Sequence, residues 1–137
     1  MVSNTMDLTG TLEEIENEYW GRTPFFPSGL VKRCYRLRKK KLCDFSPGDF
    51  RVLIGQKFSL DILFPLAIEL LENSPLVEGD FYPGDLLENC LKASVDYPNF
   101  TQRLKSISAR ALIGLKSENF EVDLLKDEIE AFLARET

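Results

Sequence analysis

The chain has 137 residues, 44% of them hydrophobic and 28% charged, with 17 basic and 22 acidic side chains and a net charge of −5. This size and composition fit one globular domain over 1–137, and no stretch approaches the ~18 uninterrupted apolar residues of a membrane span. Histidine is absent, which excludes Ser-His-Asp and Cys-His catalysis and histidine-based metal sites.

The N-terminal stretch and the cysteines bear on where the protein works. Residues 1–10 show no signal-peptide pattern, so we expect a cytoplasmic protein with a flexible stretch there. Cys34, Cys43 and Cys90 are widely spaced, and no CxxC pair is present. We therefore predict buried free thiols rather than a disulfide framework or a zinc site, and we expect no metal or cofactor.

The first half of the chain predicts three short helices separated by loops. TLEE begins the first with a capping box, and that helix should run from 11 to about 20. A second helix should begin after proline and serine, at about 28, and fray in the lysines near 39–41. SPGDF begins a third helix over 46–55, with proline in its first turn and glycine at its end.

The second half predicts further helices around an apolar centre. The segment 59–73 is apolar almost all round, which is typical of a helix surrounded by others. Helical spacing of apolar residues continues over about 86–91, 98–115 and 120–135. Because no pair of alternating runs with a hairpin turn competes, we predict an all-α fold. It should be a single compact bundle of six or seven short helices around 59–73.

A basic run, KRCYRLRKKK at 32–41, contains seven basic residues and no acidic one. The rest of the chain then has 10 basic against 22 acidic residues, a net charge of −12. Clustered Lys and Arg suggest one hypothesis, a small helical nucleic-acid-binding protein acting through 32–41. The alternative is a solvated helix face, which we favour because the acidic remainder would repel a polyanion.

The acidic remainder suggests a different partner class, a basic protein. The segment SENFEVDLLKDEIE, residues 117–130, carries six acidic residues against a single lysine. Its candidate contacts are Glu118, Glu121, Asp123, Asp127, Glu128 and Glu130. On charge alone, a docking face and a solubilising face are equally compatible with this pattern.

The segment EGDFYPGDLL, residues 78–87, admits a catalytic interpretation. Asp80 could pair with Asp85, or Glu78 with Asp80, as acid and base or as metal ligands. However, the spacing is not that of a calcium loop, and no second carboxylate motif offers a partner. We therefore expect no catalytic residues here and predict that the protein is not an enzyme.

A structural interpretation of the same segment accounts for more residues. Gly79 and Gly84 permit tight backbone conformations, and Pro83 can begin a helix. Phe81 and Tyr82 would then anchor the loop onto the core. The segment is thus predicted to be a turn that leads into a helix.

Three blocks of the chain together resemble the immunity proteins of bacterial contact-dependent growth inhibition systems. They are LVKRCYRLRKKKL (30–42), SPGDFRVLIGQ (46–56) and LDILFPLAIELLENSPLVEGDFYPGDLL (60–87). The resemblance covers about 11–92. It implies a non-catalytic cytoplasmic inhibitor that binds the toxin domain of a cognate growth-inhibition effector, frequently a nuclease. Such an inhibitor blocks the toxin's active site or its access to substrate.

The resemblance also ranks the candidate contacts. If relatives that neutralise different toxins share EGDFYPGDLL, this stretch is a poor element for choosing the toxin, and the acidic residues of 117–130 gain weight. Glu78, Asp80, Tyr82 and Asp85 stay secondary candidates, because an exposed loop beside a helix start can also contact a partner. We expect the acidic side chains to steer the protein towards a basic nuclease.

Overall fold

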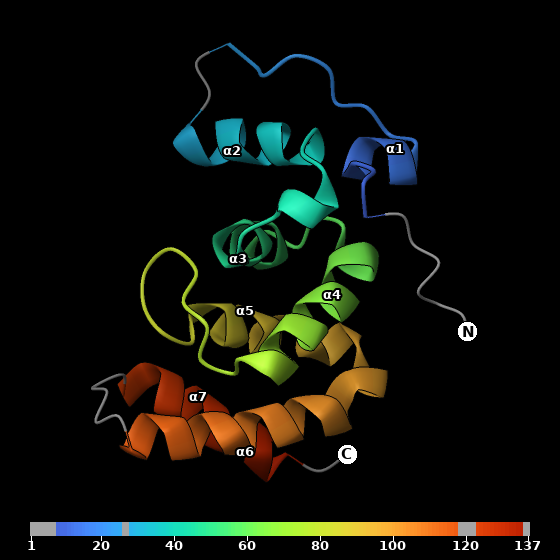
Figure 1. The fold of residues 1–137 in the computed structure, drawn as a ribbon. Helices are drawn as coiled ribbons and strands as arrows, with labels where there is room; N and C mark the ends of the chain where they lie inside the picture. Colours follow the sequence, from blue (N-terminus) through green and yellow to red (C-terminus); the bar gives the residue numbers. More distant parts are fainter. Residues whose placement is uncertain (1–7, 26–27, 118–122, 136–137) are drawn as a thin grey trace. The chain divides into compact units, whose positions relative to one another are not determined.

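The structure, a computed structural model, describes residues 8–25, 28–117 and 123–135. Within these ranges it contains seven α-helices and no strand, so the predicted all-α class is confirmed (Figure 1). The chain forms two compact units, Met1–Ser46 and Pro47–Thr137, and each is described by itself. That the whole chain acts as one domain stays a prediction.

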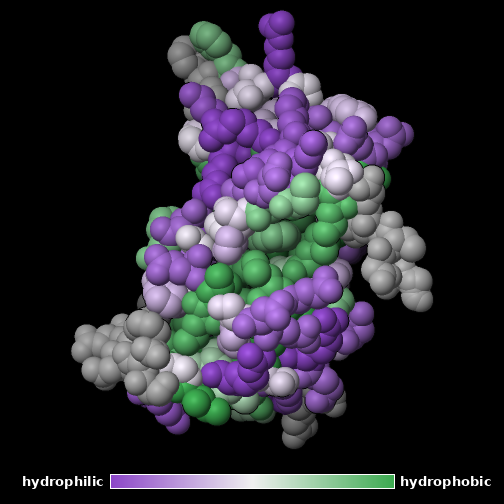
Figure 2. Space-filling model, viewed as in Figure 1, coloured by the Kyte–Doolittle hydropathy of each residue, from purple (hydrophilic) through white to green (hydrophobic). Residues whose placement is uncertain are grey.

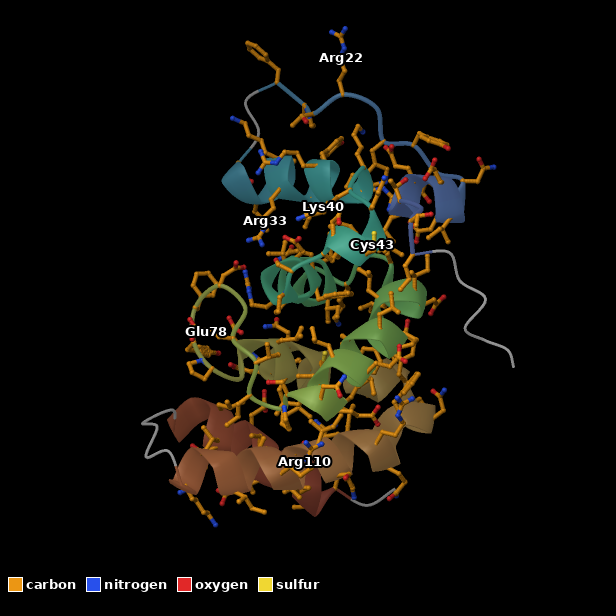
Figure 3. The ribbon with its side chains drawn as sticks, viewed as in Figure 1. Arg22, Arg33, Lys40, Cys43, Glu78 and Arg110 are labelled. Atoms are coloured by element: carbon orange, nitrogen blue, oxygen red, sulfur yellow. The ribbon has the colours of Figure 1, made fainter. Side chains whose placement is uncertain are left out.

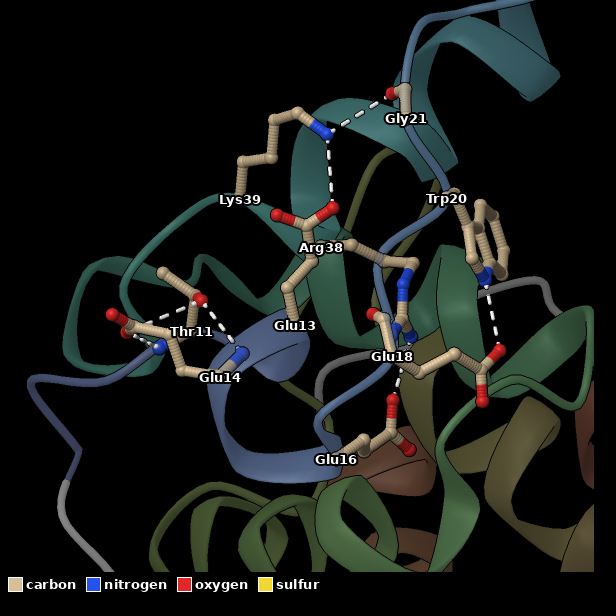
Figure 4. A network of polar contacts seen from close by, with 9 residues as sticks. All are labelled: Thr11, Glu13, Glu14, Glu16, Glu18, Trp20, Gly21, Arg38 and Lys39. Carbon is tan, nitrogen blue, oxygen red and sulfur yellow. Dashed lines mark hydrogen bonds and ion pairs between the residues drawn. The ribbon is translucent and has the colours of Figure 1, made fainter.

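The first unit contains α1 (Leu12–Glu16) and α2 (Gly29–Arg38), which contact each other, followed by a 3₁₀ turn at Leu42–Asp44. The predicted capping box is present at the start of α1 (Figure 4). The Thr11 hydroxyl accepts a hydrogen bond from the Glu14 N–H at 3.2 Å, and the Glu14 carboxylate accepts one from the Thr11 N–H at 2.9 Å. These two bonds satisfy backbone donors that a helix start otherwise leaves unpaired.

Helix α1 ends at Glu16, so the prediction that it continues to about residue 20 is wrong. Asn17 follows in the left-handed conformation at φ 53°, and its N–H donates to the Glu13 carbonyl. This is a common way to end a helix, and asparagine tolerates it better than most residues. The chain then places Trp20 against Tyr35 of α2, with the ring centroids 4.9 Å apart.

The ends of α2 follow the sequence prediction. The Ser28 hydroxyl accepts a hydrogen bond from the Val31 N–H at 3.1 Å, and the helix ends at the lysines. Beyond α2 the chain pairs with residues 8–10, since the Cys43 and Leu42 N–H groups donate to the Leu8 and Gly10 carbonyls at 2.8 and 3.0 Å. These bonds hold residues 8–10 in place, whereas residues 1–7 lie outside the described ranges.

The second unit contains five helices: α3 (Pro47–Gly55), α4 (Leu60–Asn73), α5 (Asp85–Ala93), α6 (Thr101–Ser117) and α7 (Asp123–Ala134). Helix α4 packs against α3, α5 and α6, while α5 packs against α3, α4 and α7. The central position predicted for the segment 59–73 is therefore shared between α4 and α5. Helices α6 and α7 lie side by side (Figure 1).

The apolar core of this unit forms around α4. Its fully buried side chains are Leu63, Phe64, Ala67, Ile68 and Leu71. The Phe64 ring stacks on Tyr97 at 4.8 Å between centroids and meets Phe100 edge-on at 5.5 Å. Helix α4 continues through Pro65, although proline provides no N–H for the carbonyl one turn earlier.

Helix α6 has a buried apolar stripe and a hydrophilic outer face. Its N-terminal boundary is Thr101 rather than about 98, because Pro98–Phe100 forms a 3₁₀ turn. Arg103 and Arg110 of α6 both bind Glu72 of α4. Arg103 pairs with its carboxylate at 2.7 and 2.8 Å, and Arg110 donates to its carbonyl at 2.7 Å. Arg110 is labelled in Figure 3. The hydrogen bond from Arg103 lowers the pKa of Glu72. Figure 2 shows the hydrophilic face of this helix and that of α2.

The cysteines differ in their surroundings. Cys34 and Cys90 are buried, as predicted, and burial raises the pKa of both thiols, that of Cys90 to about 12. Cys43 is exposed on the 3₁₀ turn after α2, so the prediction of a buried thiol is wrong there (Figure 3). The apolar spacing of α2 ends before this turn, so the sequence pattern gave no information on whether Cys43 is buried.

We expect one thiol of the folded protein to react rapidly with a disulfide reagent at pH 8, and all three to react after denaturation. The reason is that buried thiols with raised pKa values form little of the reactive thiolate. The measurement is the time course of thiolate release from the reagent. Cys43→Ser should abolish the rapid phase, and a rapid phase that persists in this variant would contradict the assignment.

Candidate functional site

The candidate site is built around the loop that joins α4 to α5. This loop contains Glu78 (Figure 3). The loop closes on itself through its backbone. Glu78 and Pro83 form an isolated antiparallel bridge, and the Gly84 N–H donates to the Leu76 carbonyl at 3.1 Å. The predicted turn that leads into a helix is thus present.

A single carboxylate organises this loop from inside. Asp85 is 1% exposed, and its Oδ1 accepts a hydrogen bond from the Gly79 N–H at 2.6 Å. Its Oδ2 accepts bonds from the N–H groups of Asp80 and Phe81 at 3.0 and 2.9 Å. Three consecutive N–H groups facing one anion form a backbone nest, and each bond is strengthened by the charge. Asp85 therefore has a structural role, because its carboxylate faces the loop backbone and not solvent.

The two glycines are needed at the positions where the sequence predicted tight backbone. A Cβ at Gly79 would lie 2.9 Å from Oδ1 of Asp85, and one at Gly84 would overlap Leu125 of α7. Gly84 also has φ 90°, a conformation that favours glycine. Because Gly84 is the N-cap, α5 begins at Asp85 and not at Pro83, so the predicted start at the proline is wrong by two residues.

Helix α3 holds the outer part of the loop. The Arg51 guanidinium binds Oδ2 of Asp80 through Nη2 at 2.7 Å and through Nε at 3.1 Å. Asp80 also lies so close to Gly48 that a Cβ there would overlap its carboxylate. The same guanidinium lies 4.5 Å from the centre of the Phe81 ring. The loop is thus fixed both by α3 and by the first residue of α5.

The two aromatic residues of the loop behave differently. Tyr82 is half-buried, and its hydroxyl donates to the carboxylate of Glu88 on α5, as expected of an anchor. Phe81 is 71% exposed, so the prediction that it packs onto the core is wrong. The backbone N–H groups of residues 79–81 turn inward to Asp85, and the Phe81 ring lies outside them over Arg51.

The two groups of candidate contact residues lie on elements that touch each other, the loop and α7. Gly84, at the end of the loop, packs against Leu125 of α7, and α5 packs against α7. The acidic residues of α7 therefore lie on an element next to the loop. Of these, Asp127 and Glu130 are exposed and Glu128 is half-buried. Asp123 begins α7, while the predicted contacts at Glu118 and Glu121 lie outside the described residues.

A sequence model of the family of CDI (contact-dependent growth inhibition) immunity proteins matches residues 14–107, more than half of the chain. This chain belongs to that family. The match extends into α6, further than the resemblance over 11–92, and it ends before α7. Searches among curated proteins and among solved structures gave no match. The function of the protein is thus immunity to the toxin of a contact-dependent growth inhibition system.

The basic run of the immunity protein is partly used within its own unit (Figure 4). Arg38 is 2% exposed, pairs with Glu16 at 2.6 Å and donates to the Glu18 carbonyl at 2.7 Å. Lys39 pairs with Glu13 at 2.9 Å. These contacts join α2 to α1 and the segment after it. Nucleic-acid binding through 32–41 stays a prediction, and Arg38 and Lys39 of this run have a structural use.

The part of the chain that is described shows no metal site of the usual kind. Among those residues, no three His, Cys, Asp or Glu side chains lie together where they could hold a metal ion. No helix within the same ranges has both the length and the apolar character needed to cross a membrane. Two of the nearby carboxylates instead hold the loop in place: Asp85 accepts bonds from its backbone, and Asp80 binds Arg51 of α3.

We expect Asp85→Asn to lower the free energy of unfolding by about 2–3 kcal/mol, because a carboxamide cannot replace charge-assisted bonds to three N–H groups. Amide hydrogen exchange at residues 79–81 should accelerate in parallel. Asp127→Asn is the control: it removes the same charge from an exposed position, where substitutions change stability by about 0.5 kcal/mol or less. Equal effects of the two variants would show that Asp85 does not organise the loop.

Proposed function

We propose that this immunity protein neutralises a basic nuclease toxin in the cytoplasm by binding it without catalysis and covering its active site or the path of its substrate. The observation that carries the proposal is the separation of charge along the chain. Residues 1–46 contain 8 basic and 6 acidic side chains, net +2. Residues 47–137 contain 9 basic and 16 acidic side chains, net −7.

A nuclease binds a polyanion and therefore needs a basic surface near its active site. An acidic inhibitor can occupy that surface and exclude the nucleic acid by the same electrostatic attraction. Complementary charge also raises the rate at which the two proteins meet. The acidic second unit fits such a partner, whereas a toxin with an acidic active-site surface would be repelled by it.

Exposed acidic residues on the loop and on α7 support a location for the contact. Glu78 and Asp80 lie on the loop, and Asp127 and Glu130 are exposed on α7, with half-buried Glu128 between them. Asp127 and Glu130 are three residues apart and share one face of the helix. We assign these five residues to the toxin-binding surface. Tyr82 and Asp85 act behind it, since Tyr82 is half-buried and Asp85 is buried.

Growth rescue tests the proposed function directly. The toxin domain encoded immediately upstream of this gene is expressed in a bacterium with and without the immunity protein, and its nuclease activity is assayed on RNA and DNA in vitro. We expect growth to be restored and nucleic-acid cleavage to stop at a 1:1 ratio. A toxin that cleaves no nucleic acid, or that stays active with the immunity protein bound, would refute the proposed mechanism.

We expect the association rate constant to fall as salt rises, because screening weakens attraction between the two surfaces. The double variant Asp127→Asn/Glu130→Gln should reduce this rate constant about threefold to tenfold at low salt and flatten its salt dependence. A control, Glu69→Gln/Asp96→Asn, removes two exposed charges from α4 and the turn after α5. Stopped-flow kinetics measures the association rate constant of each double variant as a function of salt. If the two variants are equal, net charge and not the α7 surface determines the rate.

A further inference from the structure

Phe81 differs from an ordinary exposed apolar side chain. Its ring is 71% exposed, although burial of a phenylalanine stabilises a fold. Isolated exposed apolar residues are common and need no explanation by themselves. The relevant property of Phe81 is that neighbouring groups hold it in an exposed position.

Three contacts provide this restraint. The Phe81 N–H donates to the buried Asp85 carboxylate at 2.9 Å, which fixes the backbone. The Arg51 guanidinium lies 4.5 Å from the ring centre, a cation–π contact. Arg51 is in turn fixed by its two bonds to Asp80. A ring ordered in advance loses little conformational entropy when a partner binds it, so more of its apolar contact contributes to affinity.

The surroundings of the ring indicate the chemistry of the partner. Glu78 and Asp80 lie on the same loop, and the acidic helix α7 packs against its end at Gly84. An aromatic side chain within a charged rim is the usual composition of an energetically dominant contact between proteins. The complementary surface is an apolar pocket bordered by Lys and Arg.

We infer that Phe81 is the aromatic anchor of toxin binding, inserting its ring into an apolar pocket at the edge of the basic surface of the toxin domain. The inference rests on the proposed function and adds one side chain that contributes strongly to the affinity. Phe81 lies within the part of the chain that matches the family, whereas α7 lies outside it. In this arrangement the loop provides the anchor, and the acidic residues of α7 determine which basic toxin is bound.

The test compares variants by equilibrium binding to the purified toxin domain encoded immediately upstream. Phe81→Ala should raise the dissociation constant more than about tenfold, chiefly through faster dissociation. Phe81→Tyr, which retains the ring, should stay within about threefold of the unsubstituted protein. Val95→Ala is the matched control, because Val95 is also 71% exposed and lies in the same unit after α5.

The outcomes separate this inference from the proposed function. If the unsubstituted protein does not bind the toxin, the proposed function fails. If it binds but Phe81→Ala weakens binding less than tenfold, or no more than Val95→Ala does, only the anchor is overturned. Radical footprinting of the unsubstituted protein gives a second measurement. Oxidation of Phe81 should fall on toxin binding, whereas that of Phe25, 85% exposed in the first unit, should not change. Unchanged oxidation of Phe81 would also overturn the anchor.

Discussion

The loop between α4 and α5 depends on the buried carboxylate of Asp85. A buried anion is costly unless hydrogen bonds compensate for its lost hydration, and three backbone N–H groups do so here. Without this carboxylate, the three N–H groups would themselves lack hydrogen-bond partners. The carboxylate and the N–H groups therefore satisfy each other's hydrogen bonds. This mutual requirement explains the glycine at position 79, because any side chain there would occupy the space of the carboxylate.

The fixed loop determines what the second unit presents to solvent. Once the backbone turns inward to Asp85, the Phe81 ring remains outside and rests on Arg51, and Asp80 is bound by the same guanidinium. The contact of Gly84 with Leu125 then places this loop beside α7. The second unit thus presents exposed carboxylates on the loop, at Glu78 and Asp80, and on α7, at Asp127 and Glu130. In the proposed function, these carboxylates attract a basic toxin.

The first unit uses charge for a different purpose. Arg38 is buried under Trp20 and bound to Glu16 and the Glu18 carbonyl, so it joins α2 to the segment that follows α1. Removing such a cation would leave its acidic partner without compensation, a larger effect than the loss of a surface ion pair. A basic run can therefore signal internal packing as well as binding to a polyanion. The counts of Lys and Arg alone do not separate the two.

The sequence by itself determined the local elements and the function class. Capping residues and helical spacing located most helix starts, because they depend on neighbours within one turn, and the blocks over 30–87 indicated the family. Only the tertiary structure decided which polar and aromatic groups face inward. The sequence offered Asp85 as a possible partner of Asp80, but the groups it binds are N–H groups four to six residues earlier in the chain. Phe81 looked like a core anchor, and its exposure follows from those bonds and from Arg51 on another helix. Contacts between distant segments leave no periodic signal in the sequence, so the exposure of Phe81 could be found only from the fold.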